Sequence, residues 1–230
     1  MDTELDLSAG YYCGMNENLN ITRGIEFEHY ISAANKASEK EVVRFILAPR
    51  LVLSFLGNGS PEAAEYQEAV RALYGVAYTL KMGLKFSKIA PVEEYFDYKM
   101  PPLETTWWDE TNSNFANKDN FSWEAMIQVP SFITSDLVRQ SQKLATLKNP
   151  NIGYQKVVLK ELDESEVLQI LHVGSYDTVA TSIAKIQSYA IDNNLILIDS
   201  EHEIYLNNPQ RTNPDKLKTI IRFSITEYIK

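Results

Sequence analysis

Hydrophobic and polar positions divide the chain into a polar leading segment and a series of strand-like and helix-like segments. Runs of β-branched and aromatic residues predict strands at 42–47 and 51–56. The sequence Gly-Asn-Gly at 57–59 predicts a turn after the second strand. A helix is predicted from residue 60 onward, because Ser-Pro-Glu combines an N-cap residue, a first-turn proline and an early acid.

The rest of the chain alternates in the same way. The pattern predicts, in order, strands 103–108 and 123–129 joined by a polar loop, a helix 131–148, a strand pair within 157–173, a helix 177–192, and strands 203–206 and 219–225. Residues 1–40 are polar and weakly periodic, which predicts an arm or peripheral segment.

The order of elements recurs in the two halves of the main segment. In each half a strand runs into a glycine-containing turn, a helix and then two strands. We interpret residues 41–230 as one α+β domain made of duplicated βαββ units, at about 41–130 and 151–230, joined by helix 131–148. This interpretation makes Glu104 and Glu203 equivalent, although any α+β domain with hairpins could give a similar order.

Composition narrows the classes of protein. The 230 residues carry a formal net charge of −9, which disfavours nucleic acid as a partner. The single Cys13 forms no internal disulfide, and the acidic start lacks the pattern of a secretion signal. The most apolar stretch, 42–56, contains two arginines and is too short to span a membrane. We therefore expect a cytoplasmic protein that does not insert into membranes.

One candidate for chemistry is a carboxylate beside a phenol. Glu203 and Tyr205 share one face of a predicted strand because side chains alternate, while His202 points to the other face. The pair could hold a cation or could orient or deprotonate a water. A solvated glutamate on an outward face is the commoner alternative for a single Glu.

Aromatic residues supply further candidates. Trp107 and Trp108 are neighbours on a predicted strand, so Trp108 should share a face with Glu104 and Trp107 should point to the other face. The sequence leaves open which of the two indoles lines the pocket. Tyr74 and Tyr78 lie one turn apart on the first long helix, where tyrosines are more often core residues than ligand contacts. Phenols that line a partly wet cavity would nonetheless find hydrogen-bond partners at little cost.

The sequence contains no motif for metal binding, phosphate binding or a serine nucleophile. The three histidines show no metal-ligand spacing, so we expect no metal site. The Gly-Asn-Gly-Ser sequence at 57–60 lacks the spacing of a phosphate-binding loop, and there is no GxSxG nucleophile motif. We therefore expect no cofactor.

The segment 202–209 (HEIYLNNP), followed by 214–219, resembles the GyrI-like small-molecule-binding domain family. Four further segments resemble the family in the same order: 66–81, 103–108, 123–130 and 169–177. The resemblance covers roughly residues 45–230 and is greatest to stand-alone, single-domain bacterial members. Ser175 and Asn208 depart from residues that are usual in the family.

The resemblance implies one curved antiparallel sheet, a ligand groove at the pseudo-two-fold axis between the halves, and helices on the far side. It identifies Glu203 as the groove glutamate, Tyr78 as the helix tyrosine and Trp107 with Trp108 as the tryptophan pair. On this basis Glu203 and Tyr78 are the expected catalytic residues. The expected ligand-binding residues are Trp107, Trp108, Tyr74, Tyr205, Glu104 and His172.

The resemblance does not decide between an enzyme and a binding protein. Relatives fused to transcription activators bind lipophilic, often cationic drugs, whereas stand-alone relatives are linked to hydrolysis of cyclopropanoid DNA-alkylating toxins. The chain is therefore expected to bind an aromatic small molecule and to be either a detoxifying hydrolase or a non-catalytic binding or sensing module. Modulation of gyrase or another partner protein follows only from the family name. A monomer or a homodimer is expected.

Overall fold

The computed structural model describes residues 8–109, 120–198 and 200–227, and for residues 8–18 it describes the helical backbone only. The helices are α1 (Ser8–Ala34), α2 (Ala64–Lys85), α3 (Ser135–Lys148) and α4 (Ala180–Asp192). The strands are β1 (Val43–Leu47), β2 (Arg50–Asn58), β3 (Leu103–Asp109), β4 (Phe121–Val129), β5 (Val158–Leu162), β6 (Ser165–Val173), β7 (Leu195–Leu197), β8 (Glu201–Tyr205) and β9 (Lys218–Glu227).

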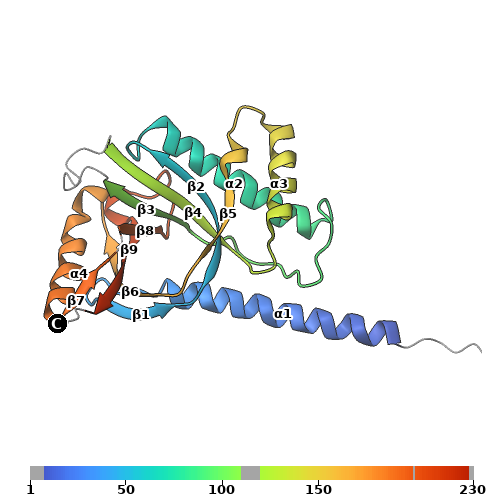
Figure 1. Cartoon of the computed structure of the whole chain (residues 1–230), viewed down its shortest axis with the longest axis horizontal. Helices are drawn as coiled ribbons and strands as arrows, with labels where there is room; N and C mark the ends of the chain where they lie inside the picture. The colour runs from blue at the N-terminus through green and yellow to red at the C-terminus, as the bar shows by residue number, and fades with distance from the viewer. Residues whose placement is uncertain (1–7, 110–119, 199, 228–230) are drawn as a thin grey trace, which may run out of the picture.

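The strands form one strongly curved antiparallel sheet (Figure 1). Its order is β1-β6-β9-β8-β3-β4-β2-β5, with β7 paired to the end of β9. The order is symmetric about the central β3–β8 pair: β2, β3 and β4 form one half and β6, β8 and β9 form the other. This arrangement confirms the predicted α+β fold with duplicated βαββ units.

The leading strand of each unit pairs with the other unit. β1 precedes β2 along the chain but pairs with β6, and β5 precedes β6 but pairs with β2. Only two residues separate each leading strand from the next one. The two units are therefore joined at the outer edges of the sheet as well as at its centre.

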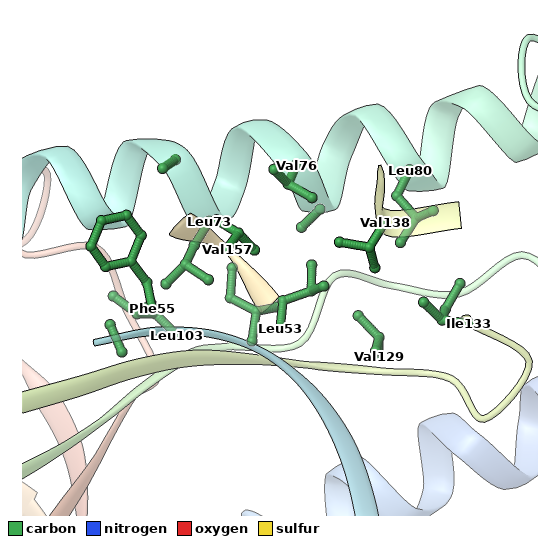
Figure 2. Close-up of a cluster of buried hydrophobic side chains, with 14 of the residues drawn as sticks. Leu53, Phe55, Leu73, Val76, Leu80, Leu103, Val129, Ile133, Val138 and Val157 are labelled. Carbon is green, nitrogen blue, oxygen red and sulfur yellow. The ribbon is translucent and has the colours of Figure 1, made fainter. Parts of the chain in front are cut away.

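Three helices cover one side of the sheet, which we call the helix side. α2 packs on β2 and β4, and its apolar stripe meets side chains such as Leu53 and Phe55 (Figure 2). α3 packs beside α2 and adds Val138 to the same core. In the second half, Ile186 of α4 packs against Leu168 and its neighbours on β6 and β9. Burial of these side chains is the main stabilising contribution to the layer.

The leading segment forms a helix against the other side of the sheet, which we call the α1 side (Figure 1). Near the end of α1, Ala34 packs with Leu47 and Val167. The Ala34 carbonyl accepts hydrogen bonds from Gln169 Nε2 at 3.1 Å and from Arg222 Nη2 at 2.7 Å. A cation at the last carbonyls of a helix also interacts favourably with the helix dipole. These contacts fasten the helix end to the sheet.

Most predicted elements agree with the structure within a few residues. Gly59 has a positive φ of 99°, which favours glycine, and a Cβ at Gly57 would lie 2.4 Å from the Trp123 ring. Steric constraints therefore require glycine at both positions of the predicted turn. α2 begins at Ala64, later than predicted. The predicted loop between β3 and β4 lies mostly outside the described residues. Among the described helices, none has the length and apolar character needed to cross a membrane.

Candidate functional site

The central β3–β8 pair places two different sets of polar groups on its two sides. Thr105 pairs with Glu203 and Thr106 pairs with His202. Directly paired residues of antiparallel strands point to the same side, and successive residues alternate. The odd-numbered residues of both strands therefore face the helix side, and the even-numbered residues face the α1 side.

On the helix side, the Glu203 carboxylate accepts two hydrogen bonds at one oxygen. Tyr205 Oη donates to Glu203 Oε2 at 2.5 Å, and Trp107 Nε1 donates to the same oxygen at 3.2 Å. The Trp107 indole also lies 3.2 Å from Tyr205 Oη. Glu203 is 9% exposed and Trp107 is 4% exposed. Glu203 and Tyr205 thus lie on one face of β8, as the alternation of side chains predicts, and the Glu203 carboxylate is largely buried.

Aromatic rings from both halves surround this carboxylate. Tyr66 of α2 stacks obliquely on Trp107, with ring centroids 5.0 Å apart, and its hydroxyl bonds Thr105 Oγ1 at 2.8 Å. Tyr176, which lies before α4, meets the Tyr205 ring edge-on at 6.1 Å. We call the set Tyr66, Trp107, Tyr176, Glu203 and Tyr205 the Glu203 cluster.

Charge in the Glu203 cluster is predominantly negative. Burial, together with the nearby Glu203 charge, raises the pKa of Glu201 to about 8 and that of Tyr176 to about 12. The pKa of Tyr205 is raised well above its ordinary value for the same two reasons. The phenols therefore remain protonated hydrogen-bond donors at neutral pH. A buried carboxylate beside rings and neutral donors can attract a cation or orient a water.

Glu104 does not belong to this cluster, and its predicted equivalence to Glu203 is wrong. Glu104 pairs with Ile204 and faces the α1 side. The two glutamates are 99 residues apart. Because both strands place odd-numbered residues on the helix side, equivalent residues must be separated by an even number. The predicted alignment of the two halves was therefore shifted by an odd number of residues. Such a shift places a side chain on the opposite side of the sheet.

Glu104 instead forms a buried ion cluster on the α1 side. Its Oε2 accepts a hydrogen bond from His202 Nε2 at 2.9 Å and lies 3.9 Å from Arg50 Nη2. Burial raises the pKa of Glu104, but the His202 hydrogen bond and the positive charges of Arg50 and Arg222 outweigh it and lower the pKa to about 2. Glu104 is therefore ionised at neutral pH.

The other predicted site residues are dispersed. Trp108 faces the α1 side, as the strand alternation predicts. Tyr78 is 48% exposed and stacks on Tyr74 at 6.0 Å. His172 is buried near the end of β6, where its Nδ1 lies 2.9 Å from Ser182 Oγ of α4. In the described contacts, Glu203, Tyr205 and Trp107 come together, whereas Trp108, Tyr74, Tyr78, Glu104 and His172 do not join them.

Three residues of the local environment, Tyr66, Tyr176 and Glu201, were not among the predicted site residues. Glu201 could have been found by alternation, because it is two residues before Glu203 on the same strand. Tyr66 was recognised only as one tyrosine of the helix, and the sequence carried no signal to favour it over Tyr78. Among the described residues, no group of three or more His, Cys, Asp or Glu side chains could hold a metal ion.

The side of the sheet also differs from the expectation. The resemblance implied helices on the far side from the groove, but Glu203 and Tyr205 face the helix side and contact Tyr66 of α2. The Glu203 cluster therefore lies next to the helices, where α2 and the turn before α4 approach the central strand pair.

Comparison with known proteins identifies the family of the chain. The model of the GyrI-like small molecule binding domain matches residues 46–225. An uncharacterized conserved protein from Listeria innocua has 29% identity and a TM-score of 0.81, and a hydrolase from Listeria innocua has 28% identity and a TM-score of 0.78. Each alignment covers 87% of this chain and 98% of the other chain.

A more distant likeness concerns the fold alone. The EcmrR C-terminal domain has 11% identity and a TM-score of 0.53 over 81% of this chain and 98% of that chain. A comparison with proteins of curated function gives no match. Because the family model spans more than half of the chain and the fold agrees, this protein belongs to the GyrI-like small-molecule-binding domain family.

Proposed function

We propose that the chain binds a lipophilic, aromatic small molecule at the Glu203 cluster and hydrolyses electrophilic compounds of the cyclopropanoid toxin type. The observation that carries the proposal is the Glu203 carboxylate, 9% exposed and held by Trp107 Nε1 and Tyr205 Oη among further rings. Additional support comes from a relative described as a hydrolase, which matches over 98% of its own length.

In the proposed reaction Glu203 is the general base. Water attacks a carbon of the strained ring, the ring C–C bond breaks, and its electron pair moves to the conjugated acceptor group. Glu203 takes the proton from the water and passes it to that acceptor, so that one water is added in net. Once Glu203 holds the proton taken from the water, the Tyr205 hydroxyl turns its single proton from Glu203 Oε2 toward the developing negative charge and donates a hydrogen bond to it.

The experiment is incubation with a cyclopropanoid toxin, followed by mass spectrometry. The wild-type protein is expected to add the mass of one water to the toxin. Glu203→Gln keeps the shape and removes the base, so turnover should fall by about 10²-fold or more. Glu164→Gln, an exposed glutamate between β5 and β6, is the matched control and should retain wild-type turnover. Wild-type turnover in Glu203→Gln contradicts this mechanism.

The assignment of the assisting phenol has its own test. The resemblance assigns this part to Tyr78, whereas Tyr205 is the phenol that bonds Glu203. We expect Tyr205→Phe to lower turnover and Tyr78→Phe to leave it nearly unchanged. The reverse result restores Tyr78 to the role.

A second candidate function is binding without chemistry. Glu203 Oε2 already accepts hydrogen bonds from a phenol and an indole, and hydrogen bonds to a carboxylate lower its basicity. The same buried negative charge and rings would suit a lipophilic aromatic cation. Binding of such a cation that depends on Glu203, with unchanged mass of the toxin after long incubation, supports this second function.

A further inference from the structure

A separate cavity lies on the α1 side of the sheet, behind the Glu203 cluster. Its volume is about 140 Å³. The lining comprises Arg50, Arg222 and His202, together with Leu47, Val167 and four hydroxyl side chains that include Thr106 and Ser224. Except for Ser200, which directly precedes β8, these residues belong to strands of both halves. The cavity therefore lies where the two units meet.

The two arginines that line the cavity are buried but differ in their partners. Arg222 is 2% exposed, and its guanidinium donates to Gln169 Oε1 at 2.8 and 2.9 Å and to the Ala34 carbonyl. Arg50 is 8% exposed. Within the described part of the chain, the Arg50 guanidinium has one ion pair, with Glu104 at 3.9 Å, and no hydrogen bond. That distance exceeds the hydrogen-bond range.

A buried guanidinium has five N–H donors that require acceptors. Leaving them unsatisfied in the interior is costly, and the cost is greater for a charged group than for a neutral one. Arg50 lines the cavity, so a molecule held in the cavity can supply acceptors to its guanidinium. The space is large enough for several waters at about 30 Å³ each, and hence for a small anion.

The charge balance favours an anion over water alone. Arg50 and Arg222 contribute two positive charges, and Glu104 contributes one negative charge to the same cluster. No carboxylate is among the described residues that line the cavity. Burial lowers the pKa of Arg222 to about 10, with the Glu104 charge opposing this effect and the Arg50 charge adding to it.

We propose that this cavity is a binding site for a small oxyanion, such as phosphate, sulfate or a carboxylate, with the Arg50 guanidinium as its principal donor. Arginine presents a planar fork of donors that matches such anions. The hydroxyls of Thr106 and Ser224 supply neutral donors. The proposal does not rest on the function proposed for the Glu203 cluster, because that cluster faces the other side of the sheet.

The test is calorimetric titration of the wild-type protein with sodium phosphate, sulfate or acetate, with sodium chloride at matched ionic strength as the reference. The overall charge of −9 opposes non-specific anion binding, so saturable heat reports a local site. We expect saturable binding of at least one oxyanion and a matching rise of the unfolding temperature. Their relative affinities distinguish a tetrahedral anion from a carboxylate. Absence of saturable binding by all three overturns the proposal.

Two arginine variants form a matched pair. Arg50→Gln removes the proposed donor, and oxyanion affinity should fall by about tenfold or more, because hydrogen bonds to charged groups are among the stronger ones. Arg44→Gln makes the same chemical change on β1, where Arg44 forms an exposed ion pair with Glu166 of β6. This variant should change the oxyanion affinity by less than about twofold. Equal affinities of the two variants contradict the assignment of Arg50.

A third variant keeps the test valid if Arg50→Gln does not fold. Ser224→Val replaces a half-buried hydroxyl on β9 with a β-branched side chain that suits a strand. The change narrows the cavity without altering the charge. Oxyanion binding should be weakened severalfold while folding is retained. Unchanged binding in a folded Ser224→Val protein places the anion elsewhere and overturns the proposal.

Discussion

Two buried glutamates on neighbouring strands of this protein occupy opposite electrostatic environments. Glu104 faces the α1 side and meets His202 and two arginines, whereas Glu203 faces the helix side and meets an indole, phenols and a second acid. Both are less than 10% exposed. The alternation of side chains along β3 and β8 is sufficient to create this difference.

The two carboxylates have different surroundings, and these suit different roles: Glu104 is paired with positive groups of the protein, whereas Glu203 is the residue for which we propose chemistry. Glu104 is neutralised by fixed positive groups of the chain itself, so its charge is already compensated. Among the described residues, Glu203 is held by the neutral donors Trp107 and Tyr205, and its charge raises the pKa of Glu201 and Tyr176. Buried acidic groups whose pKa values are shifted by neighbouring charges are typical of functional sites.

The largest expected difference concerns the free energy of unfolding. Glu104→Gln removes the counter-charge of buried Arg50, and loss of one partner of a buried ion pair typically costs about 3–5 kcal/mol. Glu203→Gln should cost about 1 kcal/mol or less, because Trp107 and Tyr205, its partners among the described residues, are neutral donors that Gln can still satisfy. Urea unfolding of both variants measures the difference. Equal losses would mean that the two environments are not distinct.

A smaller difference is expected between two tyrosines of α2. Tyr66→Phe leaves the buried Thr105 hydroxyl without its 2.8 Å partner, so the loss should be about 1–2 kcal/mol. Tyr78→Phe changes a phenol that is 48% exposed, and its effect should be within about 0.5 kcal/mol. Thermal unfolding of the pair provides the measurement, and a larger effect of Tyr78→Phe would contradict the packing described for α2.

The pH dependence of stability has opposite signs on the two sides of the sheet. The folded pKa of Glu201 is raised from 4.5 to about 8, so the folded state binds more protons and stability falls as pH rises through this interval. The folded pKa of Glu104 is lowered to about 2, so its contribution is present above 4.5 and is lost as pH falls toward 2.

Glu201→Gln isolates the helix-side contribution. The variant should show a flatter dependence of unfolding free energy on pH between about 4.5 and 8 than the wild type, with little change below 4.5. Chemical denaturation across this range checks the result. A slope identical to that of the wild type would contradict the raised pKa of Glu201.

Local patterns were sufficient to predict most of the sheet and three helices. Glycine turns, proline and capping residues mark element ends, and alternation within one strand correctly assigned Glu203 and Tyr205 to one side. α1 was not predicted as a helix because its sequence lacks a clear apolar stripe. Its end is fixed by contacts of Ala34 with distant strands, which no local pattern encodes. The three-residue β7 is too short to give a periodic signal.

The candidate site was predictable only within a strand, not between elements. Alternation relates Glu203 to Tyr205, but the register that relates Glu104 to Glu203 depends on pairing across the sheet. Likewise, Tyr66 and Tyr78 lie on one helix about 18 Å apart along its axis, at 1.5 Å per residue. Which of them contacts Trp107 depends on how α2 is placed over the strands, and this is a tertiary property.

The most direct test of the account is a crystal structure with a lipophilic aromatic cation bound at a concentration that saturates binding in solution. We predict that the rings of the ligand lie against Trp107 and Tyr205 on the helix side of the sheet, with the cationic centre toward Glu203. A ligand bound against the exposed Tyr74–Tyr78 stack or in the Arg50 cavity, with the Glu203 cluster unoccupied, would contradict the central claim.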